Sequence, residues 1–146
     1  MTAPDRDANG LIRAMNAALL MANLKPRDID VVVAHGTGTR YNDAMEAVAL
    51  EKVFLRHGAR PAVTAAKGLI GHTLGASGLL EAVLVLDMLQ TGLAPGVVGL
   101  QTPERDDLGL VIGRRAHDDD IRHIMKLASG FGGFNAAVIL SDRPAP

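Results

Sequence analysis

Two histidines and a lysine follow short apolar runs of this chain, at positions where side chains often do chemistry. His35 opens the motif HGTGT after a run rich in valine, and Lys67 and His72 enclose the motif KGLIGH after a second apolar run. Open α/β sheets bind ligands at the carboxyl ends of their strands, which is where both motifs are expected. Two neutral imidazoles there could donate N–H bonds to one carbonyl oxygen and stabilise an enolate that develops on it.

A positive charge and a carboxylate accompany the two histidines. Lys67 could raise the local potential, and Glu46 could hold it in place as an ion pair. Taken singly, a histidine after a strand is more typical of a hydrogen-bonded structural residue than of a catalyst, but the combination favours a catalytic site. The chain has no cysteine, so a thiol partner for these histidines comes from elsewhere or does not exist.

Length and composition predict one soluble α/β domain over residues 1–146. An apolar content of 48% suffices for a buried core, and a net charge of −1 with dispersed charges offers no basic face to nucleic acid. The lack of cysteine excludes disulfides and thiolate metal sites and fits a reducing cytoplasm. The N-terminus lacks the apolar core of a signal peptide, and no segment has about 18 uncharged apolar residues for a membrane span. We expect a cytoplasmic protein without a membrane partner.

Periodicity predicts an alternation of helices and strands. Apolar residues recur at helical spacing over 9–23, and a second helix is expected over 43–56, with Asn42 or Asp43 as its N-cap. The other predicted elements are a third helix over 73–90, two buried strands over 29–34 and 61–66, and short strands over 109–112, 122–127 and 136–140. This order indicates a mixed five-stranded sheet with helices on it.

The third predicted helix is apolar nearly all round. Between residues 74 and 89 its only charged residues are Glu81 and Asp87. Such a helix must be covered on nearly all sides, whereas one sheet covers one side. Either another half-domain covers the far side, or the first helix and the C-terminal strands of this chain wrap around it.

Three blocks of the sequence resemble, in order and spacing, signature blocks of the β-ketoacyl synthases, the condensing enzymes of fatty-acid and polyketide synthesis. The blocks are DVVVAHGTGTRYNDAMEAVALEKVF over 30–54, KGLIGHTLGASG over 67–78 and SGFGGFNAAVIL over 129–140. The resemblance covers essentially the whole chain, but only the C-terminal half of such an enzyme. The family's N-terminal half, with the cysteine that carries the acyl chain, has no counterpart here.

The resemblance implies a role for each candidate residue. His35 and His72 would hold the carbonyl of a malonyl thioester and assist its decarboxylation, with Lys67 between them and Glu46 as the carboxylate partner of that lysine. Phe131 would be the gating residue of the glycine-rich loop that contains Gly132, and its backbone N–H would form half of an oxyanion hole. The N–H of the missing cysteine would form the other half. No metal or bound cofactor is implied, since acyl groups would arrive on the phosphopantetheine of an acyl carrier protein.

Some residues depart from the family's usual pattern. Arg40, Gly68 and Ser129 replace residues that the family usually has after HGTGT, after the lysine and before the gating phenylalanine. None of these changes removes a supposed catalytic group, so they bear on substrate preference rather than on the chemistry.

The sequence therefore predicts half of a thiolase-like α/β fold, with a central apolar helix that needs a covering partner. The resemblance implies an acyltransferase that performs decarboxylative Claisen condensation only together with a cysteine-bearing N-terminal half. That half could be a separate chain or belong to a longer enzyme of which this chain is a part, or a second copy of this chain could replace it in a homodimer. The alternative is a non-catalytic, self-dimerising or scaffold remnant of a ketosynthase.

Overall fold

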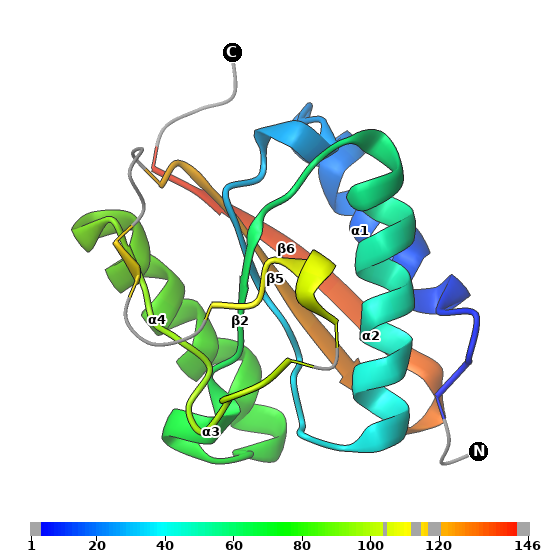
Figure 1. Cartoon of the computed structure of the whole chain (residues 1–146). Helices are drawn as coiled ribbons and strands as arrows, with labels where there is room; N and C mark the ends of the chain where they lie inside the picture. The colour runs from blue at the N-terminus through cyan, green and yellow to red at the C-terminus, as the bar shows by residue number, and fades with distance from the viewer. Residues whose placement is uncertain (1–3, 104, 112–114, 117–120, 143–146) are drawn as a thin grey trace.

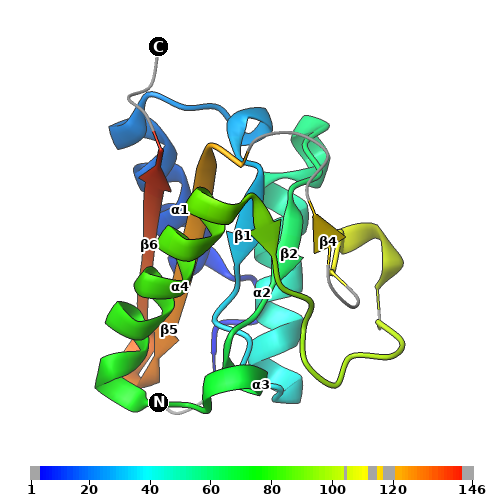
Figure 2. The ribbon, with the colours of Figure 1, turned by 90° about the vertical axis from the view of Figure 1, so that its left-hand side faces the viewer.

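A computed structural model describes residues 4–103, 105–111, 115–116 and 121–142, which form a sheet covered by helices on both faces (Figures 1 and 2). The helices are α1 (Asn9–Ala22), α2 (Arg40–Val53), α3 (Lys67–Ile70) and α4 (Ser77–Thr91), with 3-10 turns at Pro26–Asp28, Leu55–His57, Leu74–Ala76, Asp106–Leu108 and Phe131–Gly133. The strands are β1 (Val31–Val33), β2 (Ala62–Thr64), β3 (Leu93–Ala94), β4 (Arg115–Ala116), β5 (His123–Gly130) and β6 (Phe134–Ser141).

The main sheet is mixed, as predicted, and has the strand order β2-β1-β5-β6. Strand β1 is parallel to both β2 and β5, whereas β5 and β6 form an antiparallel hairpin. The expected count of five strands is wrong for the described residues, because the segment predicted over 109–112 pairs with β2 only through a bridge between Leu110 and Val63. Gly109 has a φ of +69°, so the chain bends as it reaches this edge. Ile112, at the end of that prediction, lies outside the described residues.

The three predicted helices are confirmed as α1, α2 and α4, but α2 begins three residues earlier than expected. Its N-cap is Thr39 rather than Asn42 or Asp43, and Asp43 lies in its first turn. The Thr39 hydroxyl contacts the hydroxyl of Thr37 at 2.8 Å and does not cap the helix. The side chain of Asn42 donates to Glu46 at 2.8 Å, so it is engaged within the helix instead of at its end.

Alternation along the strands creates two apolar cores, one on each face of the sheet. Val32 of β1 packs into the core formed with α1 and α2, whereas Val31 and Val33 pack into the core formed with α4. Strand β5 alternates in the same way, with Met125 facing α1 and α2 and Ile124 facing α4. The parallel strands are therefore covered on both faces, which explains why their sequences are continuous apolar runs.

Helix α4 is covered on one side only, and its opposite side is apolar. Val85 and Met88 are buried against the sheet, and the outward side chains are exposed by 44–75%: Leu79 (75%), Leu80 (44%), Val83 (57%) and Leu86 (49%). In Figure 2 this side of α4 faces the viewer, with the sheet behind it and α1 and α2 beyond the sheet. The first helix and the C-terminal strands thus do not wrap around α4 in this chain.

The stretch Leu74–Thr91 is long and apolar enough to cross a membrane, by length and composition alone, and 22% of it is buried. Its middle residue Glu81 is fully buried and lies within ion-pair distance of Lys67 and Lys126. Since these lysines come from α3 and β5, the contacts join the helix to the end of the sheet. These ion pairs are typical of a helix that packs against a sheet of the same domain.

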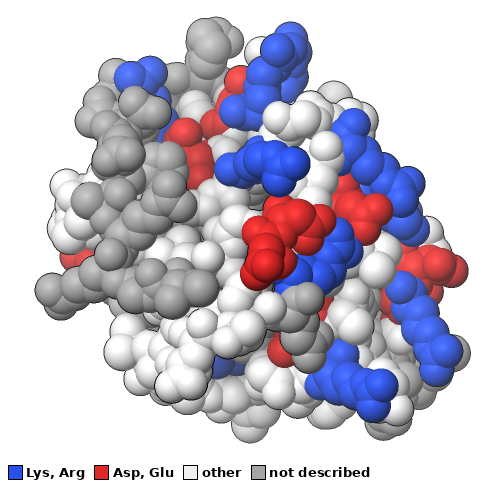
Figure 3. Space-filling view, viewed as in Figure 1, with Lys and Arg blue, Asp and Glu red and all other residues white. Residues whose placement is uncertain are grey.

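The surface seen from the direction of Figure 1 has no region of a single charge. On the side of α1 and α2, Lys and Arg side chains are interspersed with Asp and Glu (Figure 3). The lower left of this view, over α3 and the start of α4, is mostly uncharged. This view agrees with the dispersed charges of the sequence and offers no continuous basic surface to a polyanion.

Candidate active site

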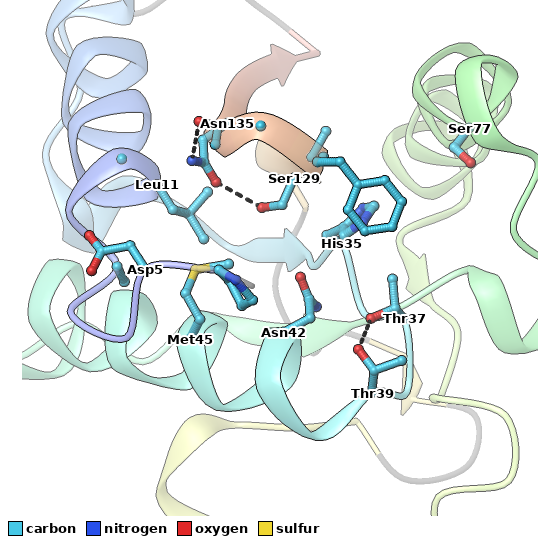
Figure 4. A pocket seen from close by; sticks show the side chains of 18 of the residues that line it. Asp5, Leu11, His35, Thr37, Thr39, Asn42, Met45, Ser77, Ser129 and Asn135 are labelled. Atoms are coloured by element: carbon cyan, nitrogen blue, oxygen red, sulfur yellow. Dashed lines mark hydrogen bonds between the residues drawn. The ribbon is translucent and has the colours of Figure 1, made fainter. Parts of the chain in front are cut away.

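The structure brings the two motif histidines together where β1 and β2 end. The rings of His35 and His72 meet edge to face, with their centroids 5.6 Å apart. His35 is buried, whereas His72 is exposed at the start of the turn that leads into α4. Both line a cavity of about 1100 Å³ that also reaches the N-terminus of α1 and the hairpin between β5 and β6. The cavity is shown in Figure 4, with His35 near its centre.

Lys67 lies between this histidine pair and α4, and its ammonium group has three acceptors. Its Nζ is 3.2 Å from Nδ1 of His35, 2.5 Å from the backbone oxygen of His35 and 2.7 Å from Oε1 of Glu81. The three N–H bonds of an ammonium group are thereby all engaged. Lys67 therefore fixes the position of the His35 ring.

The expected ion pair between Lys67 and Glu46 is wrong. Glu46 instead accepts hydrogen bonds from the backbone N–H groups of His35 (2.6 Å) and Gly36 (2.8 Å) and from the side chain of Asn42. Buried backbone N–H groups need acceptors, and these two lie in the turn after β1, where the sheet no longer supplies them. Burial raises the pKa of the Glu46 carboxyl group, against the lowering effect of these hydrogen bonds. Glu46 thus shapes the loop that presents His35.

The carboxylate partner of Lys67 is Glu81, which the sequence prediction did not place in the site. Glu81 is fully buried in the middle of α4, and its Oε2 lies 2.9 Å from Nζ of Lys126 on β5. A signal for it was present in the sequence, because a carboxylate in an apolar helix is costly to bury and is commonly paired with a cation. The sequence did not show which cations pair with Glu81, because the two lysines are distant from it in the chain. Lys67 lies 14 residues before Glu81, and Lys126 lies 45 residues after it.

Hydrogen bonds fix the tautomers of both rings. The backbone N–H of Leu74 donates to Nδ1 of His72 at 3.1 Å, and the ammonium of Lys67 donates to Nδ1 of His35. An Nδ1 atom that accepts a hydrogen bond carries no proton, so the proton of each neutral ring is on Nε2. The site therefore holds two Nε2–H donors, the arrangement that can stabilise negative charge on an oxygen atom in the cavity.

The environment of His35 keeps its ring neutral. Burial, and next the positive charge of Lys67, lower the pKa of His35 to about 4. The positive charge of Lys126 acts in the same direction, while the carboxylate of Glu81 opposes it. At neutral pH this imidazole is therefore a hydrogen-bond donor without a charge.

We expect this lowered pKa to make the folded state less stable in acid. The unfolded chain takes up a proton on His35 near the ordinary value of 6.5, whereas the folded chain takes it up only near 4. The contribution of His35 to stability is therefore complete above about pH 6.5 and is lost as the pH falls toward 4. Urea unfolding measures the free energy of unfolding of wild type and of His35→Gln at each pH. As the pH falls over this range, wild type should lose about 1–3 kcal/mol of stability relative to His35→Gln.

The comparison with His35→Gln is needed because Glu46 has the opposite effect. Its pKa is raised in the folded state, so its contribution to stability increases as the pH falls. Both proteins contain Glu46, and the difference between them isolates His35. Parallel pH dependences for wild type and His35→Gln would contradict the assignment of a neutral, buried His35.

The hairpin between β5 and β6 brings the glycine-rich loop to the same cavity. Phe131 and Gly132 line it, and the Phe131 side chain is 83% exposed. Gly132 has a φ of +82°, a backbone conformation that favours glycine, and it allows the tight connection between the two strands. The hydroxyl of Ser129 donates to the side chain of Asn135 at 2.9 Å and ties the ends of the strands together (Figure 4).

This chain is similar in sequence to β-ketoacyl synthases. Residues 1–101 match the family described as "Beta-ketoacyl synthase, C-terminal domain". The 3-oxoacyl-[acyl-carrier-protein] synthase 2 of Coxiella burnetii is 37% identical over 142 residues, which are 97% of this chain and 34% of that protein. This chain therefore belongs to the β-ketoacyl synthase family.

Solved structures give the same result for the fold. A ketosynthase/chain length factor named for ishigamide is 32% identical with a TM-score of 0.85, over 96% of this chain and 34% of that one. A type II polyketide ketosynthase, solved in complex with its acyl carrier protein, is 26% identical with a TM-score of 0.86, over 97% and 35%. The prediction of a thiolase-like fold that covers only part of such an enzyme is confirmed, but the share is smaller than the predicted half. The chain spans about a third of the length of the relatives it matches.

Proposed function

We propose that this chain is the C-terminal part of a β-ketoacyl synthase that extends a fatty-acid or polyketide chain by decarboxylative Claisen condensation. The observation that carries the proposal is the pair of Nε2–H donors that His35 and His72 present to one cavity. Hydrogen-bond donors aimed at an oxygen that gains negative charge lower the barrier of a reaction that passes through an enolate. The family membership of the chain supports the same chemistry.

In the proposed reaction the growing acyl chain is held as a thioester on a cysteine of the N-terminal half. The bond between the α-carbon and the carboxylate of a malonyl thioester breaks, CO₂ leaves, and the electron pair forms an enolate whose oxygen accepts bonds from His35 and His72. The α-carbon then attacks the acyl carbonyl, and the cysteine sulfur leaves as a thiolate that takes up a proton. The backbone N–H of Phe131, in the loop shaped by Gly132, would stabilise the oxyanion formed during this attack.

The supporting residues have separate roles in this proposal. Lys67 holds the ring of His35, Glu81 holds Lys67, and Glu46 orders the loop between β1 and α2. No metal or bound organic cofactor is needed, because the paired donors and the oxyanion hole stabilise the charge that develops. The chain contains no cysteine, so we expect it to be inactive in condensation when alone.

The proposed partner on the exposed side of α4 is the cysteine-bearing N-terminal half. The exposed apolar side chains of α4 form a row of the kind expected at an obligate interface. In addition, this chain accounts for only about a third of the length of its relatives. For the substrates we propose delivery on an acyl carrier protein, since a related ketosynthase was solved in complex with one. We place the assembly in the cytoplasm, in keeping with the absence of cysteine.

Mixing the chain with a cysteine-bearing ketosynthase N-terminal half should give a stable complex, measured by light scattering. We expect Val83→Glu, in the middle of the exposed row on α4, to weaken that complex at least tenfold, because a charge would be buried there without a partner. The matched control is Met21→Glu on α1, which is 89% exposed and lies across the sheet from α4. Glutamate is a good helix former, so neither change should disturb its helix.

The same mixture tests the function. The complex should form a β-ketoacyl product from an acyl thioester and a malonyl thioester, and neither half should do so alone. A stable monomer that takes up no partner would contradict the role assigned to the α4 surface. A self-dimer that excludes the N-terminal half would favour a non-catalytic scaffold and overturn the proposed function.

A further inference from the structure

Lys126 is a buried lysine of the site for which the proposed reaction has no use. It lies on β5 two residues after Ile124 and so faces α4, where its side chain is 6% exposed and its Nζ is 2.9 Å from Oε2 of Glu81. It also lines the cavity that contains His35 and His72. A buried ammonium group is costly unless an anion pairs with it, and here the single carboxylate of Glu81 serves both Lys126 and Lys67.

The two lysines that share Glu81 differ in the use of their N–H groups. Lys67 donates to three acceptors, whereas Oε2 of Glu81 accepts no hydrogen bond in the described part of the chain. The contact of Lys126 with that oxygen is thus an ion pair without the geometry of a hydrogen bond. Lys126 retains N–H donors that a ligand in the cavity can use.

The charges in contact with Glu81 do not cancel. Two ammonium groups, of Lys67 and Lys126, share the single carboxylate of Glu81, which leaves one positive charge in excess. His35 carries no charge at neutral pH, and Glu46 does not line the cavity but accepts the backbone N–H groups of the turn after β1. An excess positive charge at a buried position favours an anionic ligand.

We propose that Lys126 is a specificity-determining residue that binds the free carboxylate of a malonyl-type acyl group in this cavity. The inference rests on the proposed function and adds a residue that selects the extender by its charge. Because the carboxylate leaves as CO₂, an interaction with it strengthens substrate binding more than it stabilises the transition state. Lys126 should therefore affect the affinity or KM for the extender, and kcat much less.

The test measures binding to the complex of this chain with the cysteine-bearing half, with no acyl chain present and therefore without condensation. The probes are a pantetheine amide that carries a malonyl group and the same compound with a carboxamide in place of the free carboxylate, titrated by NMR. Wild type should prefer the carboxylate probe about tenfold or more, the usual strength of a hydrogen bond to a charged group. Lys126→Met should remove this preference and leave the affinity for the carboxamide unchanged, and Lys126→Arg should restore much of it.

Each outcome has one meaning for the role of Lys126. Equal affinity of wild type for both probes would overturn the proposal, even if Lys126→Met failed to fold. If Lys126→Met lost the same affinity for both probes, Lys126 would have a structural role, and this result would also overturn the proposal. Condensation by the assembled enzyme is a separate measurement, so the proposed function can stand when this inference fails.

Discussion

Replacing His72 by alanine should reduce condensation by the assembled enzyme about 10²–10³-fold, the usual cost of removing one donor from a charge-stabilising site. His72 is exposed at the cavity, and its hydrogen bond from the N–H of Leu74 leaves Nε2–H as the donor to substrate. The ring is not part of an apolar core, so the fold and the complex with the N-terminal half should persist. The loss should therefore be in the rate of the chemical step.

The measurement compares kcat of the complex, with complex formation followed by light scattering. His57→Ala is the matched control, since His57 is also an exposed histidine and lies at the end of a 3-10 turn after α2. We expect it to have wild-type kcat. His72→Gln, which keeps an N–H donor near the same place, should recover part of the lost rate. Wild-type kcat in His72→Ala with an intact complex would remove His72 from the site.

Replacing Glu81 by alanine should destabilise the folded chain by about 3–5 kcal/mol, the usual cost of removing one partner from a buried ion pair. Glu81 is fully buried, and its loss leaves the ammonium groups of Lys67 and Lys126 in the core without a counter-charge. Lys67 also holds the ring of His35, so the active site should lose its order together with the stability.

Urea unfolding followed by circular dichroism measures this effect. The control is Glu51→Ala, because Glu51 also contacts two cations, Arg56 and Arg105, but at a partly exposed position. Exposed ion pairs contribute about 0–1 kcal/mol, so the control should unfold almost like wild type. Equal effects of the two substitutions would show that the charges around Glu81 are solvated, and would also weaken the inference about Lys126.

The sequence did not distinguish Glu46 from Glu81 as the carboxylate partner of Lys67. Both are acidic residues of predicted helices, and each could have paired with Lys67. They lie on opposite sides of the sheet, since Glu46 is on α2 and Glu81 is on α4. A helix pattern tells which residues share one face of that helix, but not which face of the sheet the helix covers.

The sequence by itself determined the local parts of this protein. The apolar runs of β1 and β2 predicted that His35 and Lys67 follow strand ends, with His72 five residues after Lys67, because strands and turns depend on nearby residues. The apolar composition of α4 likewise indicated that one sheet leaves a side of this helix uncovered, since a helix that is apolar nearly all round needs a cover on nearly all sides.

Only the tertiary structure decided which distant residues meet. The contact of Glu81 with Lys126 joins residues 45 positions apart, and the single bridge of Leu110 to β2 depends on how the chain returns to the sheet edge. Such contacts follow from the packing of whole elements, which adjacent residues do not encode. The charge of the candidate site, and with it the expected preference for an anionic acyl group, is therefore a property of the folded chain.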